Sequence, residues 1–204
     1  MNPYWSYILL GYVLGGMLFA SWIPRVLHHV DVTEGTEDGN PGTFNAFSKC
    51  GVPTGVLVLV CELGKAFLPV FAAQCQLGRE DPRFALVLLA PVLGHVFPIL
   101  HRCRGGKGIA ASFGVLLALI PDWRPVLTLA LCYILFSTAV RVETHLWRSV
   151  ITYGVFALLA CSRFAAGPVR DGSVLVALVV IAGHLLRRTE AQGFSVRLLW
   201  RHAG

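Results

Sequence analysis

The sequence has few charged residues for its length. Only 14% of its 204 residues are Asp, Glu, Lys or Arg, whereas 55% are hydrophobic and the mean hydropathy is +0.67. Soluble globular domains carry about 25% charged residues. The composition therefore excludes an ordinary soluble domain, and it indicates an integral membrane protein whose residues 1–204 form a single domain.

Several signatures of other protein classes are also absent. The six cysteines form no Cys-x-x-Cys pair and are scattered, so we interpret them as small buried hydrophobic residues. No residues have metal-ligand spacing, and we expect no metal and no cofactor. The basic residues are few and spread over loops, which argues against nucleic-acid binding. No basic stretch precedes the first apolar run, so we expect residues 1–24 to be a retained helix rather than a cleaved signal peptide.

Seven apolar segments alternate with polar or turn-rich connections. Several approach the roughly 20 residues that a helix needs to cross a bilayer. They cover residues 5–24, 53–76, 83–100, 108–121, 124–140, 148–166 and 173–187. The fourth is short for a full crossing. We predict an all-α integral membrane fold of about seven transmembrane helices, some short or broken; five spans with two re-entrant segments is the alternative.

The distribution of Lys and Arg predicts the orientation. The connections after the first, third, fifth and seventh segments carry most of them: Arg25, Lys49, Arg102, Arg104, Lys107, Arg141, Arg148, Arg187, Arg188, Arg197 and Arg201. By the positive-inside rule these connections are cytoplasmic and the N-terminus lies outside. Residues 188–204 then form a basic cytoplasmic tail.

One polar loop on this predicted cytoplasmic face reads "EDGNPGTFN", residues 37–45. Gly39 and Gly42 flank a turn, and Asn40 and Asn45 each offer hydrogen-bond donors and acceptors. These side chains can orient a polyol or a phosphate oxygen. A simple helix cap is the alternative interpretation.

A second loop on the same face reads "RGGKG", residues 104–108. Gly105, Gly106 and Gly108 permit a positive φ and a close approach of backbone N–H groups to an anion. The helix that begins near Gly108 points its positive end to the same place, and Lys107 adds a full charge. The loop is not a Walker A motif. It predicts a phosphate-binding site, with a basic turn as the alternative.

The second apolar segment contains Glu62 and Lys65, three residues apart on one helix face. A charge pair inside a membrane is costly and indicates a functional site; a purely structural pair is the alternative. Such a pair also fits a small transporter or channel. The sequence shows no internal repeat, and both glycine-rich loops lie on one predicted face, which favours a single site.

Three stretches, in this order, resemble motifs of the bacterial acyl-phosphate:glycerol-3-phosphate acyltransferases. The family's G-S-G-N-P-G-A-T-N-x-x-R is similar to the run from Gly39 to Asn45. Its acidic residue and lysine in the second span resemble Glu62 and Lys65. Its G-H-x-F-P-x-x-x-x-x-x-G-G-K-G-x-A matches "GHVFPILHRCRGGKGIA", from Gly94 to Ala110. The resemblance covers about residues 10–120.

The resemblance implies a multi-pass enzyme of the bacterial inner membrane with its site on the cytoplasmic face. It implies transfer of a fatty acyl group from acyl phosphate to glycerol 3-phosphate, giving lysophosphatidic acid for phospholipid synthesis. Lys107 and the glycine N–H groups would hold the donor phosphate, without a protein nucleophile. Asn40 and Asn45 would shape the polar pocket, and His95 would form hydrogen bonds near the second loop. The lipid bilayer is the other partner that the resemblance implies.

The chain departs from the family at several motif positions. Asp38 replaces a Ser and Ser48 replaces an Arg of the first motif. The third motif, H-x-x-N-I-x-R-L-L-x-G-x-E, matches at His184, which implies a catalytic role for that residue, but Arg187 stands at its Asn and Val196 at its Glu.

The first loop and its approach are also acidic, with Asp31, Glu34, Glu37 and Asp38 close together. Carboxylates repel an anionic acceptor. Two alternatives therefore remain: a divergent paralogue with the same donor site and another acceptor (an amine or an alcohol), and a non-catalytic lipid- or phosphate-binding membrane protein.

Overall fold

The structure is a computed structural model, and it describes the chain apart from residues 1, 36–38, 188–195 and 199–204. In this described part the chain forms α-helices, one short 3-10 helix and two short strands. They are α1 (Pro3–Gly15), α2 (Phe19–His28), α3 (Thr43–Leu77), α4 (Phe84–Val96), η1 (Ile99–His101), α5 (Ile109–Leu117), α6 (Arg124–Ser137), β1 (Val140–Val142), α7 (His145–Arg163), α8 (Pro168–Leu186) and β2 (Val196–Leu198). The prediction of an all-α fold is confirmed. The sequence did not predict the antiparallel pairing of β1 with β2.

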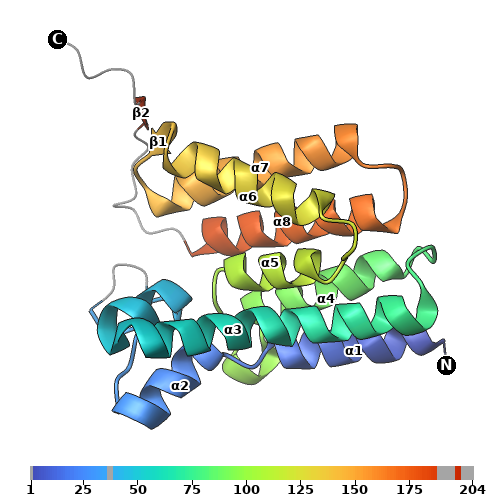
Figure 1. The fold of residues 1–204 in the computed structure, drawn as a ribbon. Coiled ribbons are helices and arrows are strands. Elements are labelled where there is room, and N and C mark those ends of the chain that lie inside the picture. Colours follow the sequence, from blue (N-terminus) through green and yellow to red (C-terminus); the bar gives the residue numbers. More distant parts are fainter. Residues whose placement is uncertain (1, 36–38, 188–195, 199–204) are drawn as a thin grey trace.

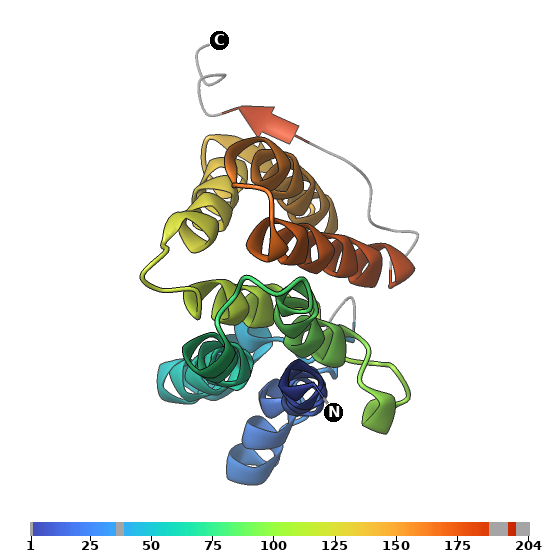
Figure 2. The ribbon, with the colours of Figure 1, turned by 90° about the vertical axis from the view of Figure 1, so that its right-hand side faces the viewer.

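The helices run back and forth between two ends of the molecule (Figure 1). The loops after α2, η1 and α6 lie at one end, and the N-terminus and the connections after α3 and α7 lie at the other. Short α5 contacts α3, α4, α6 and α8. It lies between the group of α1 to α3 and the group of α6 to α8 (Figure 2). The loop before α5, which contains the predicted phosphate-binding glycines, is thereby held at one end of the molecule.

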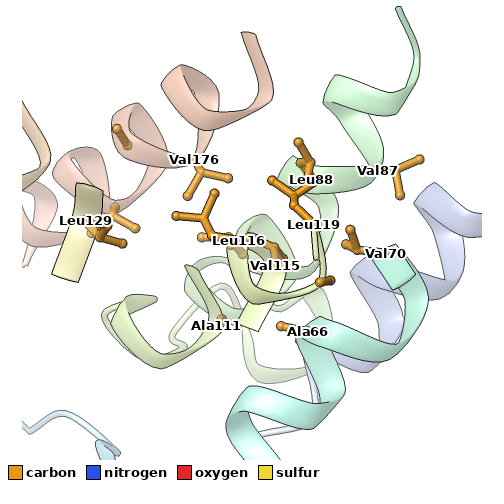
Figure 3. Close-up of a cluster of buried hydrophobic side chains, with 14 of the residues drawn as sticks. Ala66, Val70, Val87, Leu88, Ala111, Val115, Leu116, Leu119, Leu129 and Val176 are labelled. Carbon is orange, nitrogen blue, oxygen red and sulfur yellow. The ribbon is translucent and has the colours of Figure 1, made fainter. Parts of the chain in front are cut away.

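The main hydrophobic core surrounds α5 (Figure 3). It brings together fully buried side chains from α3, α4, α5, α6 and α8, among them Ala66, Val70, Leu88, Ala111, Val115, Leu116, Leu129 and Val176. Small and branched side chains interdigitate there, so the helix carrying the glycine loop has little freedom to shift.

Helices α1 and α4 pack through glycines. A Cβ on Gly15 would lie 2.1 Å from the carbonyl oxygen of Pro91, and one on Gly94 would lie 2.1 Å from that of Tyr12. Only glycine allows this approach. In lipid such close backbone contact supplies much of the packing between helices. It also fixes the place of His95, the next residue along α4.

By length and composition, α3 and α8 could each cross a membrane, and α1 with α2, bent by 41° across a short break, could be a third span. Helix α5 has nine residues, which is about 14 Å, less than half of a bilayer core of about 30 Å. Helix length alone therefore does not give seven spans.

The expectation of one helix over residues 1–24 is wrong. The chain leaves α1 after Gly15 and resumes with α2 at Phe19. Two features coincide with the break: the pair Gly15–Gly16, which disfavours helix, and the carbonyl oxygen of Met17, which accepts a hydrogen bond from Lys65 Nζ at 2.5 Å.

Other predictions also need correction. The second segment was predicted to begin at residue 53. A helical stretch from Thr43 precedes it in α3, and the helical backbone is broken at Gly51 (φ 80°), close to the predicted start. The six cysteines are free, but only Cys132 is buried, and three are exposed on the isolated chain: Cys75, Cys103 and Cys161. The predicted basic tail, residues 188–204, lies outside the described residues except for β2.

Candidate functional site

The first glycine-rich loop leads directly into α3. Gly42 is the N-cap of that helix, and Asn45 Nδ2 donates a hydrogen bond to the carbonyl oxygen of Asn40 at 2.9 Å. Asn40 is buried, whereas Gly39 is exposed with a φ of 56°. The loop is thus folded back on the first turn of α3, with Asn40 and Asn45 on its inner side.

The acidic approach to this loop is partly neutralised. Asp31 accepts hydrogen bonds from Thr33 and pairs with Arg25 at 2.6 Å. These bonds, those of Thr33 foremost, lower the pKa of Asp31 to about 2. Lys49 Nζ donates to the carbonyl oxygens of Asp31 and Glu34. The negative charge of Asp31 is therefore paired rather than directed at the loop.

The second loop packs against the end of α4. The N–H of Gly106 donates to the carbonyl oxygen of His95 at 3.0 Å, and a Cβ on Gly106 would lie 2.1 Å from His95 Nε2. Gly108 has a φ of 84° and begins α5, as the sequence predicted. Gly105 and Gly106 do not adopt the positive φ that was expected of them; Arg102 and Cys103 do.

The guanidinium of Arg187 contacts the same loop from the end of α8. It donates to the carbonyl oxygens of Gly105 at 2.8 Å, of Gly106 at 2.7 Å and of Val96. It also lies 6.0 Å from the centre of the Phe97 ring. These contacts could not be predicted from the sequence, because they join segments 81 to 91 residues apart.

Glu62 and Lys65 form a buried ion pair, as predicted from their spacing. Lys65 Nζ lies 2.6 Å from Glu62 Oε2, and the two side chains are 2% and 1% exposed. His95 Nδ1 joins the pair, at 2.9 Å from Lys65 Nζ and 3.2 Å from Glu62 Oε2. The N–H of Ala20 donates to Glu62 Oε1 at 3.0 Å, and Lys65 binds the carbonyl of Met17. The cluster therefore joins α3, α4 and the break between α1 and α2.

Both glycine-rich loops line one cavity of about 820 Å³. Most of its polar lining comes from residues near the loops, and Tyr133 adds a hydroxyl from α6. The residues near the loops are Asn40, Thr43, Asn45, Glu62, His95, Lys107 and His145. Its apolar lining follows α3, α5 and α6: Leu59, Leu63, Ile109, Phe113, Leu117 and Val126. Leu117 is nine residues along the helix from Gly108, about 14 Å deeper. The cavity has a polar end and an apolar end.

Five of the predicted site residues do not line this cavity. Gly105, Gly106 and Lys65 lie directly behind lining residues, and Gly39 is exposed beside the first loop. His184 is buried on α8, where its Nδ1–H donates to the carbonyl oxygen of Val180 at 2.8 Å.

Sequence reasoning missed His145, the first residue of α7. His145 lines the cavity, and its ring stacks on that of His184 with 6.2 Å between centroids and 9° between planes. The available signal was its position. "RVETHLWRS" is a connection on the same predicted face as the two glycine-rich loops, and it contains a titratable residue at a helix start.

Tyr133 was also missed. It lines the cavity from α6, and its hydroxyl donates to Ser149 Oγ at 3.3 Å. Beside it, Ser112 and Tyr153 form a buried hydroxyl pair between α5 and α7. Among the residues that the structure describes, no cluster of His, Cys, Asp and Glu is suited to hold a metal ion.

Comparison with known proteins points to one family. The profile of a family described as glycerol-3-phosphate acyltransferase matches residues 5–202. A protein of that name from Ralstonia nicotianae is 32% identical over 183 residues, which cover 87% of this chain and 85% of the relative. Another, from Salinibacter ruber, is 33% identical over an alignment of 212 positions, gaps included, which covers 91% of this chain and 90% of the relative.

A solved structure has the same fold. It is the crystal structure of PlsY (YgiH), described as an integral membrane glycerol 3-phosphate acyltransferase, in its glycerol 3-phosphate form. The TM-score is 0.76 and the identity 24%, over 91% of this chain and 90% of that chain. The lysophosphatidic acid form of that protein gives a TM-score of 0.73.

Proposed function

Because the chain belongs to the glycerol-3-phosphate acyltransferase family, we propose that its cavity holds an acyl phosphate and glycerol 3-phosphate together and transfers the acyl group between them. The protein is a membrane acyltransferase of phospholipid synthesis. The observation that carries the proposal is the lining of the cavity, which is polar beside the two loops and apolar along α5 and α6. An acyl phosphate has the same division into a charged head and an apolar chain.

The donor phosphate would bind at the start of α5. Lys107 supplies a positive charge, and Gly108 begins a helix whose N-terminal N–H groups favour an anion. The acyl chain would then lie against Phe113 and Leu117, toward Val126. Gly105 and Gly106 support this site from behind, where their backbone sets the place of Lys107.

Glycerol 3-phosphate would bind beside Asn40, Gly42 and Asn45, which line the cavity next to Lys107. Its hydroxyl oxygen attacks the acyl carbonyl carbon and forms the ester bond of lysophosphatidic acid. The bond from that carbon to the phosphate oxygen breaks, and the hydroxyl proton ends on the released phosphate. The anhydride is already activated, so the protein's contribution is positioning and electrostatic stabilisation.

The buried cluster around Glu62 would shape the wall between the two substrates. Glu62 and His95 reach the cavity, while Lys65 holds both from behind. His184 would contribute through His145, since the ring of His145 lies between it and the cavity.

The reaction is tested by phosphate release from palmitoyl phosphate, measured on purified protein with and without glycerol 3-phosphate. We expect release that depends on glycerol 3-phosphate and falls at least about a hundredfold in Lys107→Ala, since a positioned charge of this kind is typically worth that much. Arg163→Ala, at the exposed far end of α7, is the matched loss of a positive charge. Phosphate release at a rate that does not depend on glycerol 3-phosphate would contradict the proposal.

We also propose that the chain crosses the bacterial inner membrane seven times, with the N-terminus outside and the cavity's polar end facing the cytoplasm. Its support is the excess of Lys and Arg in the connections at the loop end, and the alternating course of the helices (Figure 1).

Two native cysteines can test this orientation, because Cys103 and Cys161 are both exposed. Cys103 follows η1 and Cys161 is near the end of α7, and these two segment ends lie at opposite ends of the molecule (Figure 1). In single-cysteine variants, a membrane-impermeant maleimide added to intact spheroplasts should label Cys161 and spare Cys103. Inverted vesicles should give the reverse, and labelling of Cys103 from the outside would overturn the orientation.

A further inference from the structure

Arg187 lies behind the second glycine-rich loop and does not line the cavity. One guanidinium nitrogen donates to the carbonyl oxygens of Gly105 and Gly106, and another donates to the carbonyl oxygen of Val96. These carbonyls belong to two segments, the end of α4 and the loop before α5. One side chain at the end of α8 thus joins three elements around the proposed phosphate site.

These bonds determine which way the loop's peptide groups face. A trans peptide points its carbonyl and its N–H in opposite directions. Because Arg187 holds the carbonyl of Gly106, the N–H of Lys107 is turned to the other side of the loop, and Lys107 and Gly108 are the loop residues that line the cavity. The guanidinium therefore keeps two carbonyl oxygens, which would repel an anion, away from the cavity.

Arg187 also contributes a positive charge. Within the described ranges no carboxylate forms an ion pair with it, and its contacts are carbonyl dipoles and the Phe97 ring. The positive potential behind the loop adds to those of Lys107 and of the α5 N-terminus. An anionic phosphate in front of the loop is stabilised by all three.

We propose that Arg187 is a positioning residue that holds the Gly105–Lys107 backbone in its anion-binding form and thereby sets the affinity for the donor phosphate. The inference rests on the proposed function in naming an acyl phosphate as that donor. Arg187 stands where the family's third motif, which matches at His184, has Asn. A planar fork of five donors can reach three carbonyls, whereas an amide has two donors and a lysine has no fork.

Two variants separate the charge from the fork. Arg187→Lys keeps the charge, and Arg187→Gln keeps an amide donor. Arg163→Lys is the control, because Arg163 is exposed and is the last residue of α7, which ends far from the second loop (Figure 1). Two quantities are measured on purified full-length protein: the KM for palmitoyl phosphate at saturating glycerol 3-phosphate, and hydrogen–deuterium exchange over residues 97–109.

In Arg187→Lys we expect the KM for palmitoyl phosphate to rise about tenfold, the equilibrium change that follows the loss of one hydrogen bond to a charged group. In Arg187→Gln the positive charge is lost as well, so the KM should rise further. The change in kcat should be smaller than the change in KM. Exchange over residues 97–109 should become more than twofold faster while exchange in α1 stays unchanged. Arg163→Lys should alter neither quantity.

The proposal is overturned if either the KM or the exchange rate stays within twofold of wild type in Arg187→Lys, the conservative variant. Should the wild-type protein release no phosphate from palmitoyl phosphate, the proposed function fails on its own. The Kd for palmitoyl phosphate, from thermal-shift titration, then replaces the KM. The same twofold limits on Kd and on exchange decide the role of Arg187, so the two failures are distinguishable.

Discussion

Replacing Lys65 by Met removes the positive half of the buried pair while keeping most of the side-chain volume. Glu62 is then left charged at 1% exposure, with Ala20 N–H and His95 as its remaining contacts. Removing one partner of a buried ion pair costs about 3–5 kcal/mol. For a chain of this length that corresponds to a fall of roughly 10 °C in Tm.

The second half of the test is the double variant Glu62→Gln with Lys65→Met. Gln keeps an acceptor for the Ala20 N–H and removes the charge, so the double variant should be more stable than the sum of the two single losses by about 2 kcal/mol. Tm is measured by intrinsic fluorescence in one detergent, with Leu158→Met on the exposed face of α7 as the control. Strictly additive losses, or a fall of less than about 3 °C in Lys65→Met, would refute the reasoning.

Three further outcomes follow from the geometry. Gly106→Ala should lower phosphate release about a hundredfold, because its Cβ would lie 2.1 Å from His95 Nε2 and the loop must move. The control is Gly154→Ala in α7, where a Cβ meets nothing within 4 Å, and it should keep full activity. Equal losses in the two variants would contradict the proposed role of the second loop. Leu117→Trp fills the deep apolar end of the cavity, so the ratio of kcat/KM for 12-carbon over 18-carbon acyl phosphate should rise. Leu131→Trp, on the exposed face of α6, should leave this ratio unchanged. An unchanged ratio in Leu117→Trp would mean that the acyl chain binds elsewhere. The pKa of Asp31 lies below its usual range, so the stabilising effect of its carboxylate is full above about pH 4 and is lost as the pH falls toward 2. The Tm of the wild-type protein should therefore fall more steeply over this pH range than the Tm of Asp31→Asn. Parallel curves of Tm against pH would contradict the stabilising role of Asp31.

The parts of the site that depend on local spacing could be predicted from the sequence. Residues three apart on a helix share a face, and this spacing predicted the ion pair of Glu62 and Lys65. A glycine-rich run before an apolar segment gave the start of α5 at Gly108. Charge distribution placed both loops on one face, and they do line one cavity.

The remaining parts depend on contacts between segments far apart in the chain. At the break between α1 and α2, the carbonyl oxygen of Met17 accepts a hydrogen bond from Lys65, a partner that the first segment does not reveal. In the sequence Arg187 looks like one more basic residue of the predicted cytoplasmic tail. Its role depends on the end of α8 lying beside Gly105, which only the structure shows. His145 has no motif around it, and only the packing of α7 against α8 brings it onto His184 and to the cavity wall.

The pairing of β1 with β2 has a practical consequence for handling the protein. Val196 to Leu198 lie against Val140 to Val142, and the chain reaches His145 at the cavity wall three residues after β1. The pairing therefore holds residues 196–198 beside the segment that leads to the cavity wall, so a change in β2 can disturb that wall. Helix α1 begins at the opposite end of the molecule (Figure 1), so a tag placed before it stays away from this segment in kinetic work.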